Sequence, residues 1–146
     1  MQIQSTRFGP IDVEPAEIIH FPEGLVGFAD CRDWVFLADT ENDALAWMQS
    51  VDRPGLTLAV VSPSRFLPGL KMRIARRELE PLRLEGMKSA RVLAIVGKTN
   101  RSVALNLKAP LVINLQRRLG RQVITNGDLP LQYELDSAAP TLKMSA

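Results

Sequence analysis

Few residues of this chain could carry out catalysis. His20 is the only histidine and Cys31 the only cysteine among 146 residues. A thiol needs a neighbouring base to act as a nucleophile, and Cys31 has no histidine near it in the sequence. A structural zinc site needs about four ligands, mostly Cys and His, which this composition does not provide. We therefore expect a structural or surface role for His20 and an inert thiol at Cys31.

Other signals of enzymatic chemistry are also missing from the sequence. Neither the GxGxxG nor the GxxxxGK[ST] phosphate-binding pattern occurs. Glu78, Glu80 and Glu85 gather around one short segment, and a solvated helix face explains such a group better than acid–base catalysis does. The sequence therefore predicts a protein that is not an enzyme and that holds neither a cofactor nor a metal.

The charges are distributed unevenly along the chain. Residues 1–60 hold ten acidic and three basic side chains, whereas residues 61–146 hold six acidic and fifteen basic ones. A basic half can indicate nucleic-acid binding, but small barrels that bind single strands combine charge with stacking aromatics. Tyr133 is the only aromatic residue from Lys71 onward. An RNA-binding β-barrel acting through the basic half is thus the alternative function, and direct nucleic-acid binding is the less favoured one.

Length and hydropathy indicate one soluble domain. The chain is 46% hydrophobic, which is enough for a core, and no apolar run approaches the roughly 20 residues that span a bilayer. The first residues lack the basic and apolar regions of a signal peptide, so we expect a cytoplasmic protein without membrane contact. We place the domain at residues 1–127 and expect a poorly ordered tail at 128–146, which has little to bury.

Short apolar runs separated by turn signals indicate an all-β barrel or sandwich. One short helix is expected at 75–82, where Pro81 must end it. The hairpin at 46–61 turns at Asp52-Arg53-Pro54-Gly55. The residues expected to be mostly buried alternate along their strands: Trp47, Leu58, Val60, Leu105, Leu107, Leu111 and Ile113.

The stretch 103–125 is expected to organise the rest of the chain. Leu111, Ile113 and Leu115 alternate with Val112, Asn114 and Gln116, so that each set lies on one face of a strand. The return strand follows at 121–125, and Gly120 is expected to supply the positive φ of the connecting loop. A bulge near Pro110 would aim side chains outward.

Three segments, in this order and spacing, resemble the flagellar assembly factor FliW family. They are FPEGLVGF (21–28), WMQSVDRPGLTLAVVSP (47–63) and NLKAPLVINLQRRLGRQVI (106–124), and IQSTRFGPIDV near the start is also similar to the family's first strands. The resemblance implies a small antiparallel β-barrel-like domain without catalysis. It also implies two cytoplasmic partners: newly made flagellin, and the translational regulator CsrA, which represses flagellin mRNA. The two compete, so that FliW freed by flagellin secretion captures CsrA and flagellin translation resumes.

We expect partners to dock on loops that a rigid β scaffold presents. Two turns inside the family-like segments carry polar groups beside apolar strands, and an acidic loop would attract a basic, RNA-binding partner. In the other interpretation Gln49, Asn106 and Asn114 bond to neighbouring backbone and serve only the fold. The expected partner-binding residues are Gln49, Ser50, Asp52 and Arg53 in the first turn, Asn106, Lys108, Pro110 and Asn114 in the second, and Asp39, Glu41 and Asp43 in the acidic loop.

Overall fold

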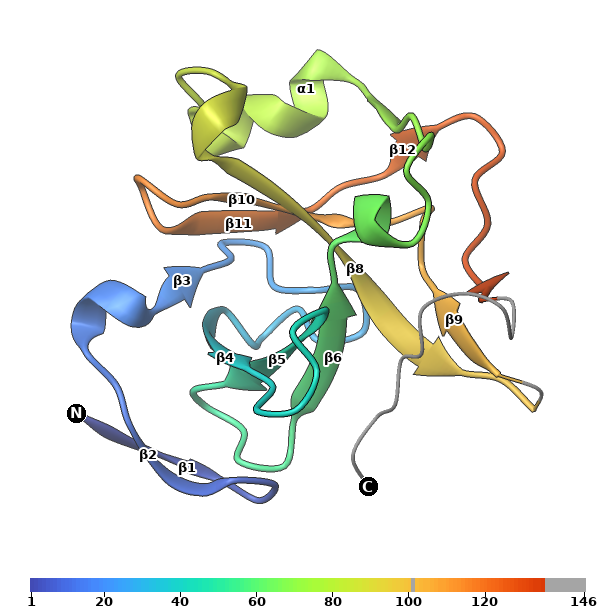
Figure 1. Cartoon of the computed structure of the whole chain (residues 1–146). Helices are drawn as coiled ribbons and strands as arrows, with labels where there is room; N and C mark the ends of the chain where they lie inside the picture. Colours follow the sequence, from blue (N-terminus) through green and yellow to red (C-terminus); the bar gives the residue numbers. More distant parts are fainter. Residues whose placement is uncertain (101, 136–146) are drawn as a thin grey trace.

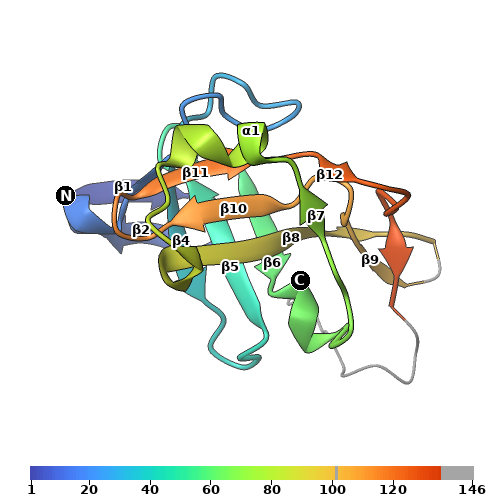
Figure 2. The same ribbon diagram turned by 90° about the horizontal axis from the view of Figure 1, so that it is seen from above.

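The computed structural model describes residues 1–100 and 102–135. Seven of its strands close into a barrel, whose arrangement can be followed in Figures 1 and 2. The order around the barrel is β10-β11-β3-β4-β5-β6-β8, and β8 pairs back with β10. All neighbours are antiparallel except β3 and β11, which run parallel at His20 and Leu119. The barrel strands are β3 (Ile19–His20), β4 (Asp33–Ala38), β5 (Leu45–Ser50), β6 (Thr57–Val61), β8 (Ala90–Lys98), β10 (Leu111–Asn114) and β11 (Leu119–Gln122).

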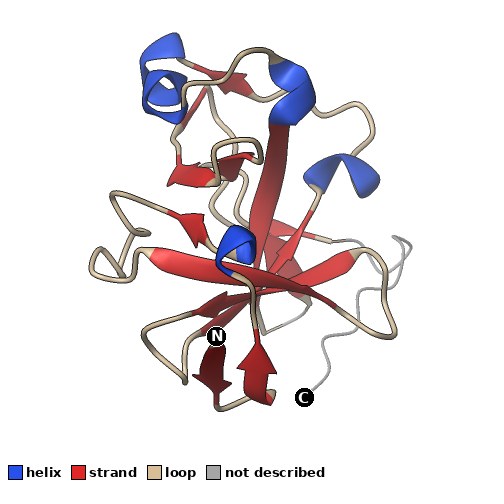
Figure 3. Ribbon diagram, turned by 90° about the vertical axis from the view of Figure 1, so that its left-hand side faces the viewer, coloured by secondary structure: helices blue, strands red, loops and turns tan. Residues whose placement is uncertain are grey.

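The remaining elements lie outside this barrel, and Figure 3 shows the helical ones as short peripheral turns. The predicted helix is present as α1 (Arg76–Leu79), and a 3-10 turn, η3 (Glu80–Leu82), follows where Pro81 interrupts it. The predicted all-β barrel is therefore confirmed. The other elements are β1 (Gln2–Ser5), β2 (Gly9–Asp12), η1 (Pro15–Glu17), η2 (Pro63–Arg65), β7 (Arg73–Ile74), η4 (Met87–Ser89), β9 (Val103–Leu105), β12 (Thr125–Asn126) and β13 (Tyr133–Glu134).

Alternation along the strands separates the barrel interior from its outer surface. The interior cluster draws one apolar set from every strand but β11, including Met48, Val60, Leu111 and Ile113. Three further apolar clusters lie on the outer surface of the barrel, each between the barrel wall and a different peripheral element. Trp47 packs against Leu105 of β9 and against Leu135, which follows β13. Val35 packs beneath the β1–β2 hairpin, and Val112 packs beneath α1 and η3.

Six of the seven predicted core residues are buried: Trp47, Val60, Leu105, Leu107, Leu111 and Ile113. Leu58 is only half-buried, because it lies near the turn that ends β5 and begins β6. The predicted role of Gly120 is wrong. Gly120 lies inside β11 opposite Ile113, and Arg118 adopts the left-handed backbone of the turn, with φ 54°.

The described chain continues in regular structure past residue 127. β13 pairs antiparallel with β9, with Tyr133 opposite Leu105. Leu135 is buried in the outer cluster that contains Trp47. The later part of the expected tail, residues 136–146, lies outside the described residues.

Candidate docking surfaces

A loop at residues 21–32 closes one end of the barrel. Phe21, Leu25 and Cys31 are buried in the interior cluster beside Trp34, and the Trp34 indole Nε1 donates a 3.0 Å hydrogen bond to the Cys31 carbonyl. Gly24 has a φ of 64°, and a Cβ there would lie 2.6 Å from two backbone oxygens. This loop at 21–32, which begins with FPEGLVGF, therefore forms a fixed plug, and Cys31 is part of the core.

Arg121 joins this plug to the outer helical cover. Its Nε donates to the Glu23 carboxylate at 2.6 Å, and its Nη1 donates both to the Glu78 carboxylate and, at 2.7 Å, to the Glu78 carbonyl. The hydrogen bond to Glu23, with further support from Glu78, raises the pKa of the Arg121 guanidinium. Glu78 is thus a half-buried partner of an arginine, and the expectation that it belongs to a solvated helix face is wrong.

Gln49 is a buried hydrogen-bonding centre. Its Oε1 accepts hydrogen bonds from the hydroxyls of Ser5 (2.7 Å) and Thr57, and its Nε2 donates to the carbonyls of Ser50 (3.0 Å) and Arg53 (3.2 Å). Ser50 is also buried, and its Oγ accepts the Arg53 N–H at 3.0 Å. These two side chains have no exposed surface for a partner, and their hydrogen bonds fix the shape of the turn.

Asp52 and Arg53 are the exposed members of that turn. The Arg53 Nη2 lies 3.2 Å from the Asp30 carboxylate, which belongs to the plug. The turn therefore presents an aspartate beside an arginine that is already paired with the loop across from it.

The second turn is divided between exposed and buried groups. The half-buried Asn106 accepts the Ala109 N–H through its Oδ1 at 3.0 Å, and Pro110 is buried. Lys108 is half-buried, and its carbonyl accepts hydrogen bonds from the backbone N–H (2.9 Å) and hydroxyl (3.1 Å) of Thr125. Asn106 and Lys108 are therefore the side chains of this turn that a partner could reach.

Asn114 is 1% exposed and lies at the far end of β10. Its Nδ2 donates to the Leu82 carbonyl at 2.8 Å, and its Oδ1 accepts the Gln116 N–H at 3.1 Å. It fastens the helical cover and the β10–β11 turn to the barrel. The predicted turn residues thus bond to different elements instead of converging on one site.

The acidic loop between β4 and β5 is held by Asp39. The Asp39 Oδ1 accepts the indole N–H of Trp47 at 2.9 Å, and Oδ2 accepts the N–H groups of Glu41 (3.1 Å) and Asn42 (2.8 Å). The Trp47 hydrogen bond, followed by the two backbone ones and the nearby Arg7 charge, lowers the pKa of Asp39. The Arg7 guanidinium lies 3.9 Å from the Trp47 ring centroid, a cation–π distance.

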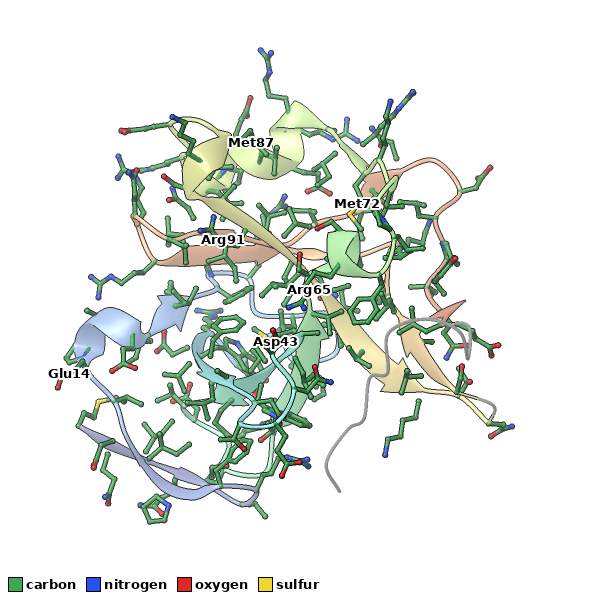
Figure 4. The ribbon with its side chains drawn as sticks, viewed as in Figure 1. Glu14, Asp43, Arg65, Met72, Met87 and Arg91 are labelled. Carbon is green, nitrogen blue, oxygen red and sulfur yellow. The ribbon has the colours of Figure 1, made fainter. Side chains whose placement is uncertain are left out.

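The basic half of the sequence also reaches this loop. An Arg65 nitrogen lies 3.4 Å from the Asp43 carboxylate, and Figure 4 shows the two side chains together. Exposed pairs of this kind are weak, about 0–1 kcal/mol, but they show that the acidic and basic halves interleave here. Glu41, two residues before Asp43, is also exposed on this loop.

The other end of the barrel is open. A hollow of about 470 Å³, here called the barrel mouth, is lined by inward-facing residues of the strands and by a rim. The inward-facing residues are Ile19, Phe36, Ala46, Leu93 and Ile113, and the rim comprises Ala16, Glu17, Arg91, Leu115 and Arg118. Sequence reasoning missed this site. The available signal was Arg91, a charged residue in phase with the inward-facing Leu93 and Ile95 of one strand.

A second hollow, the methionine groove, adjoins the barrel mouth. It measures about 430 Å³ and shares Arg91 and Leu93 with the mouth. Its other apolar lining includes Leu70, Met72, Ile74, Met87 and Val92. Met87 is 67% exposed.

Neither a metal centre nor a spanning helix was found in the part of the chain that the structure describes. Residues 1–100 and 102–135 contain no group of three or more His, Cys, Asp or Glu side chains placed to hold an ion. No helix in these ranges has the length and hydropathy to cross a membrane. His20 is exposed on β3, with Nδ1 2.7 Å from the Asp33 carboxylate.

The architecture places the chain among small closed β-barrels with loop-borne surfaces. The FliW protein family model matches residues 2–135. The flagellar assembly factor FliW of Bdellovibrio bacteriovorus is 35% identical over 126 residues, 85% of this chain and 72% of that protein. The FliW of Moorella thermoacetica is 34% identical over 131 residues, 87% and 82% of the two chains. A crystal structure of the flagellar assembly factor FliW superposes with a TM-score of 0.85 at 28% identity, covering 93% of this chain and 97% of that one. The chain belongs to the FliW family of flagellar assembly factors.

Proposed function

We propose that this protein works by binding, without catalysis, in the cytoplasm. It holds newly made flagellin, acting somewhat like a chaperone, and when free it captures CsrA and so relieves the repression of flagellin mRNA. Membership of a family of flagellar assembly factors is the observation that carries the proposal. The arrangement of a rigid barrel with exposed loop residues supports it, because such scaffolds commonly present binding sites.

The acidic loop is the proposed CsrA contact. CsrA must be basic enough to hold RNA, and opposite charges steer association and raise its rate. Glu41 and Asp43 are exposed on this loop, whereas Asp39 is occupied by Trp47 and two backbone N–H groups. Glu41 and Asp43 would thus meet the partner, while Asp39 maintains the shape of the loop.

A binding experiment across ionic strength tests the CsrA contact. The double variant Glu41→Gln, Asp43→Asn keeps the Asp39 hydrogen bonds and removes the two exposed charges. We expect slower CsrA association in this variant, and a salt dependence that is weaker than that of the parent. The matched control, Arg76→Gln with Arg77→Gln, removes two charges from the outer helix. Equal association rates for the acidic-loop variant and the parent would contradict this contact.

The two turns are proposed as a further docking region and need a separate variant. Asp52→Ala with Asn106→Ala removes side chains that are exposed or half-buried, whereas truncating Gln49 or Asn114 would damage the fold. Loss of flagellin or CsrA binding at unchanged thermal stability would assign the turns to docking. Unchanged binding would remove them. Co-purification from lysate with and without nuclease then separates protein partners from the RNA-binding alternative.

A further inference from the structure

The barrel mouth has the composition of a binding site for an amphipathic group. Its interior is formed by aliphatic and aromatic side chains, and two guanidinium groups lie on its rim. A volume of about 470 Å³ lies within the range of ligand and anchor pockets, which occur in the mouths of barrels. Phe21 and Leu25 of the plug fill the other end beside Trp34 of β4, so entry is from the rim side.

The two rim arginines are held in place without being neutralised. The Arg91 Nη1 donates to the carbonyls of Lys88 (3.3 Å) and Ala90 (3.1 Å), and the Arg118 Nη1 donates to the Pro15 carbonyl at 3.0 Å. Among residues 1–100 and 102–135, the ion pairs involve other cations. A guanidinium has five N–H donors, so each arginine keeps donors for a carboxylate. The rim acid Glu17 already accepts the Glu14 N–H at 3.0 Å.

The adjoining methionine groove indicates a polypeptide occupant. Arg91 and Leu93 line both hollows, so the surface has two apolar depressions with a cation at their boundary. In Figure 4, Arg91 of β8 is labelled below Met87 of η4, and Met72 is labelled to the right of both. Methionine adapts its shape to different partners, and one small molecule would not need both depressions.

We propose that the barrel mouth and the methionine groove form one docking surface for a segment of a partner protein with an acidic residue between two apolar ones. One apolar side chain enters the mouth, the other enters the groove, and the carboxylate binds Arg91. Arg-carboxylate contacts add geometric specificity to such apolar anchors. The identity of the partner rests on the proposed function, in which flagellin is the partner; a basic partner such as CsrA does not suit an arginine rim.

This surface and the acidic loop lie at the same end of the barrel. β4 runs away from the plug toward Ala38 and the acidic loop, and its partner β5 begins again at Leu45, beside Ala46 in the mouth. Two bulky proteins bound at these neighbouring places would obstruct each other. The geometry therefore supplies a steric route to the competition between partners.

The test measures the dissociation constant of the full chain for purified monomeric flagellin. Arg91→Glu and Met87→Glu both change exposed side chains and should each raise the dissociation constant about tenfold or more, which is the scale of an interface anchor. Two matched controls lie elsewhere: Arg77→Glu on α1 and Val26→Glu on the plug, where Val26 is 75% exposed. They should stay within about twofold of the parent. CsrA association should not be slowed in the Arg91 and Met87 variants, because the added negative charge at this end of the barrel favours a basic partner.

Photo-crosslinking identifies the docked segment. A benzoylphenylalanine at position 87 and another at position 115, in separate preparations, should attach to one flagellin segment with an acidic residue between two apolar ones. Equal flagellin affinity for parent and variants, or crosslinks to a basic segment, would overturn the docking surface while the proposed function stands. No flagellin binding by the parent would overturn both.

Discussion

The two ends of the barrel differ in whether the apolar interior is covered by the chain itself. At one end the chain supplies its own plug, in which Phe21 lies against Gly120 and Trp34 bonds to Cys31. At the other end the interior side chains of Phe36, Ala46 and Leu93 are left half-buried around a hollow. The plugged end therefore contributes stability, and the open end keeps apolar surface available for contact.

Truncating the plug should have the largest effect on stability. Phe21 is fully buried, and Phe21→Ala should destabilise the fold by about 3–5 kcal/mol through lost transfer energy and a residual cavity. Urea unfolding monitored by tryptophan fluorescence measures this loss. A change within the scatter of surface substitutions would show that the plug does not hold this end closed.

Gly120 tests how closely the plug approaches the wall. A Cβ at this position would overlap the Phe21 ring, so Gly120→Ala should cost about 1–3 kcal/mol by overpacking. Gly97 on β8 has no atom within 4 Å of such a Cβ, and Gly97→Ala is the control. If both alanine variants unfold at the same urea concentration, the close approach is not a constraint.

The acidic loop lies at the open end of the barrel, and Asp39 fixes its shape through hydrogen bonds. The pKa of the Asp39 carboxyl is lowered in the folded protein, below the ordinary value of about 3.9. A depressed carboxyl pKa stabilises the fold above the unfolded-state pKa, and this stabilisation is lost as pH falls through the folded-state pKa. Melting temperatures of the parent and Asp39→Asn should therefore differ at pH 7, begin to converge below about pH 4 and meet once pH has fallen below the folded-state pKa. A constant difference over this range would contradict the contribution of the carboxylate.

The rim of the open end should be the least sensitive region. Leu115 is 45% exposed at the barrel mouth, and Leu115→Gln should change the unfolding free energy by no more than about 0.5 kcal/mol. Val26→Gln gives the equivalent change on the exposed tip of the plug. A marked destabilisation at Leu115 would mean that the open end is part of the core.

The alternating strands were predictable from sequence because burial on one face imposes a period of two. Trp47, Val60 and Ile113 are buried as predicted, but their neighbours Met48, Ala59 and Val112 are buried too, because the outer clusters cover the other face of these strands. The prediction for Gly120 was wrong because a glycine beside a turn usually indicates positive φ. In the structure, glycine is needed there because the ring of Phe21, a residue far away in the sequence, lies against its backbone. Such contacts between segments far apart in sequence leave no local pattern.

Candidate site residues were harder to predict for a related reason. Gln49 and Asn114 stood out as polar residues in apolar strands, but that pattern does not separate a docking group from a buried hydrogen-bonding one. In the structure both have partners on several segments. The barrel mouth needed knowledge of which strand ends come together, which only the closed topology provides.

The parallel pairing of β3 with β11 has a consequence for biosynthesis. It joins His20, near the start of the chain, to Leu119, near its end. A nascent chain cannot complete the wall until the segment with β11 has left the ribosome, and such non-local closure is slow. Until then the early strands have their interior face exposed, so the nascent chain is open to aggregation up to the point at which β11 emerges.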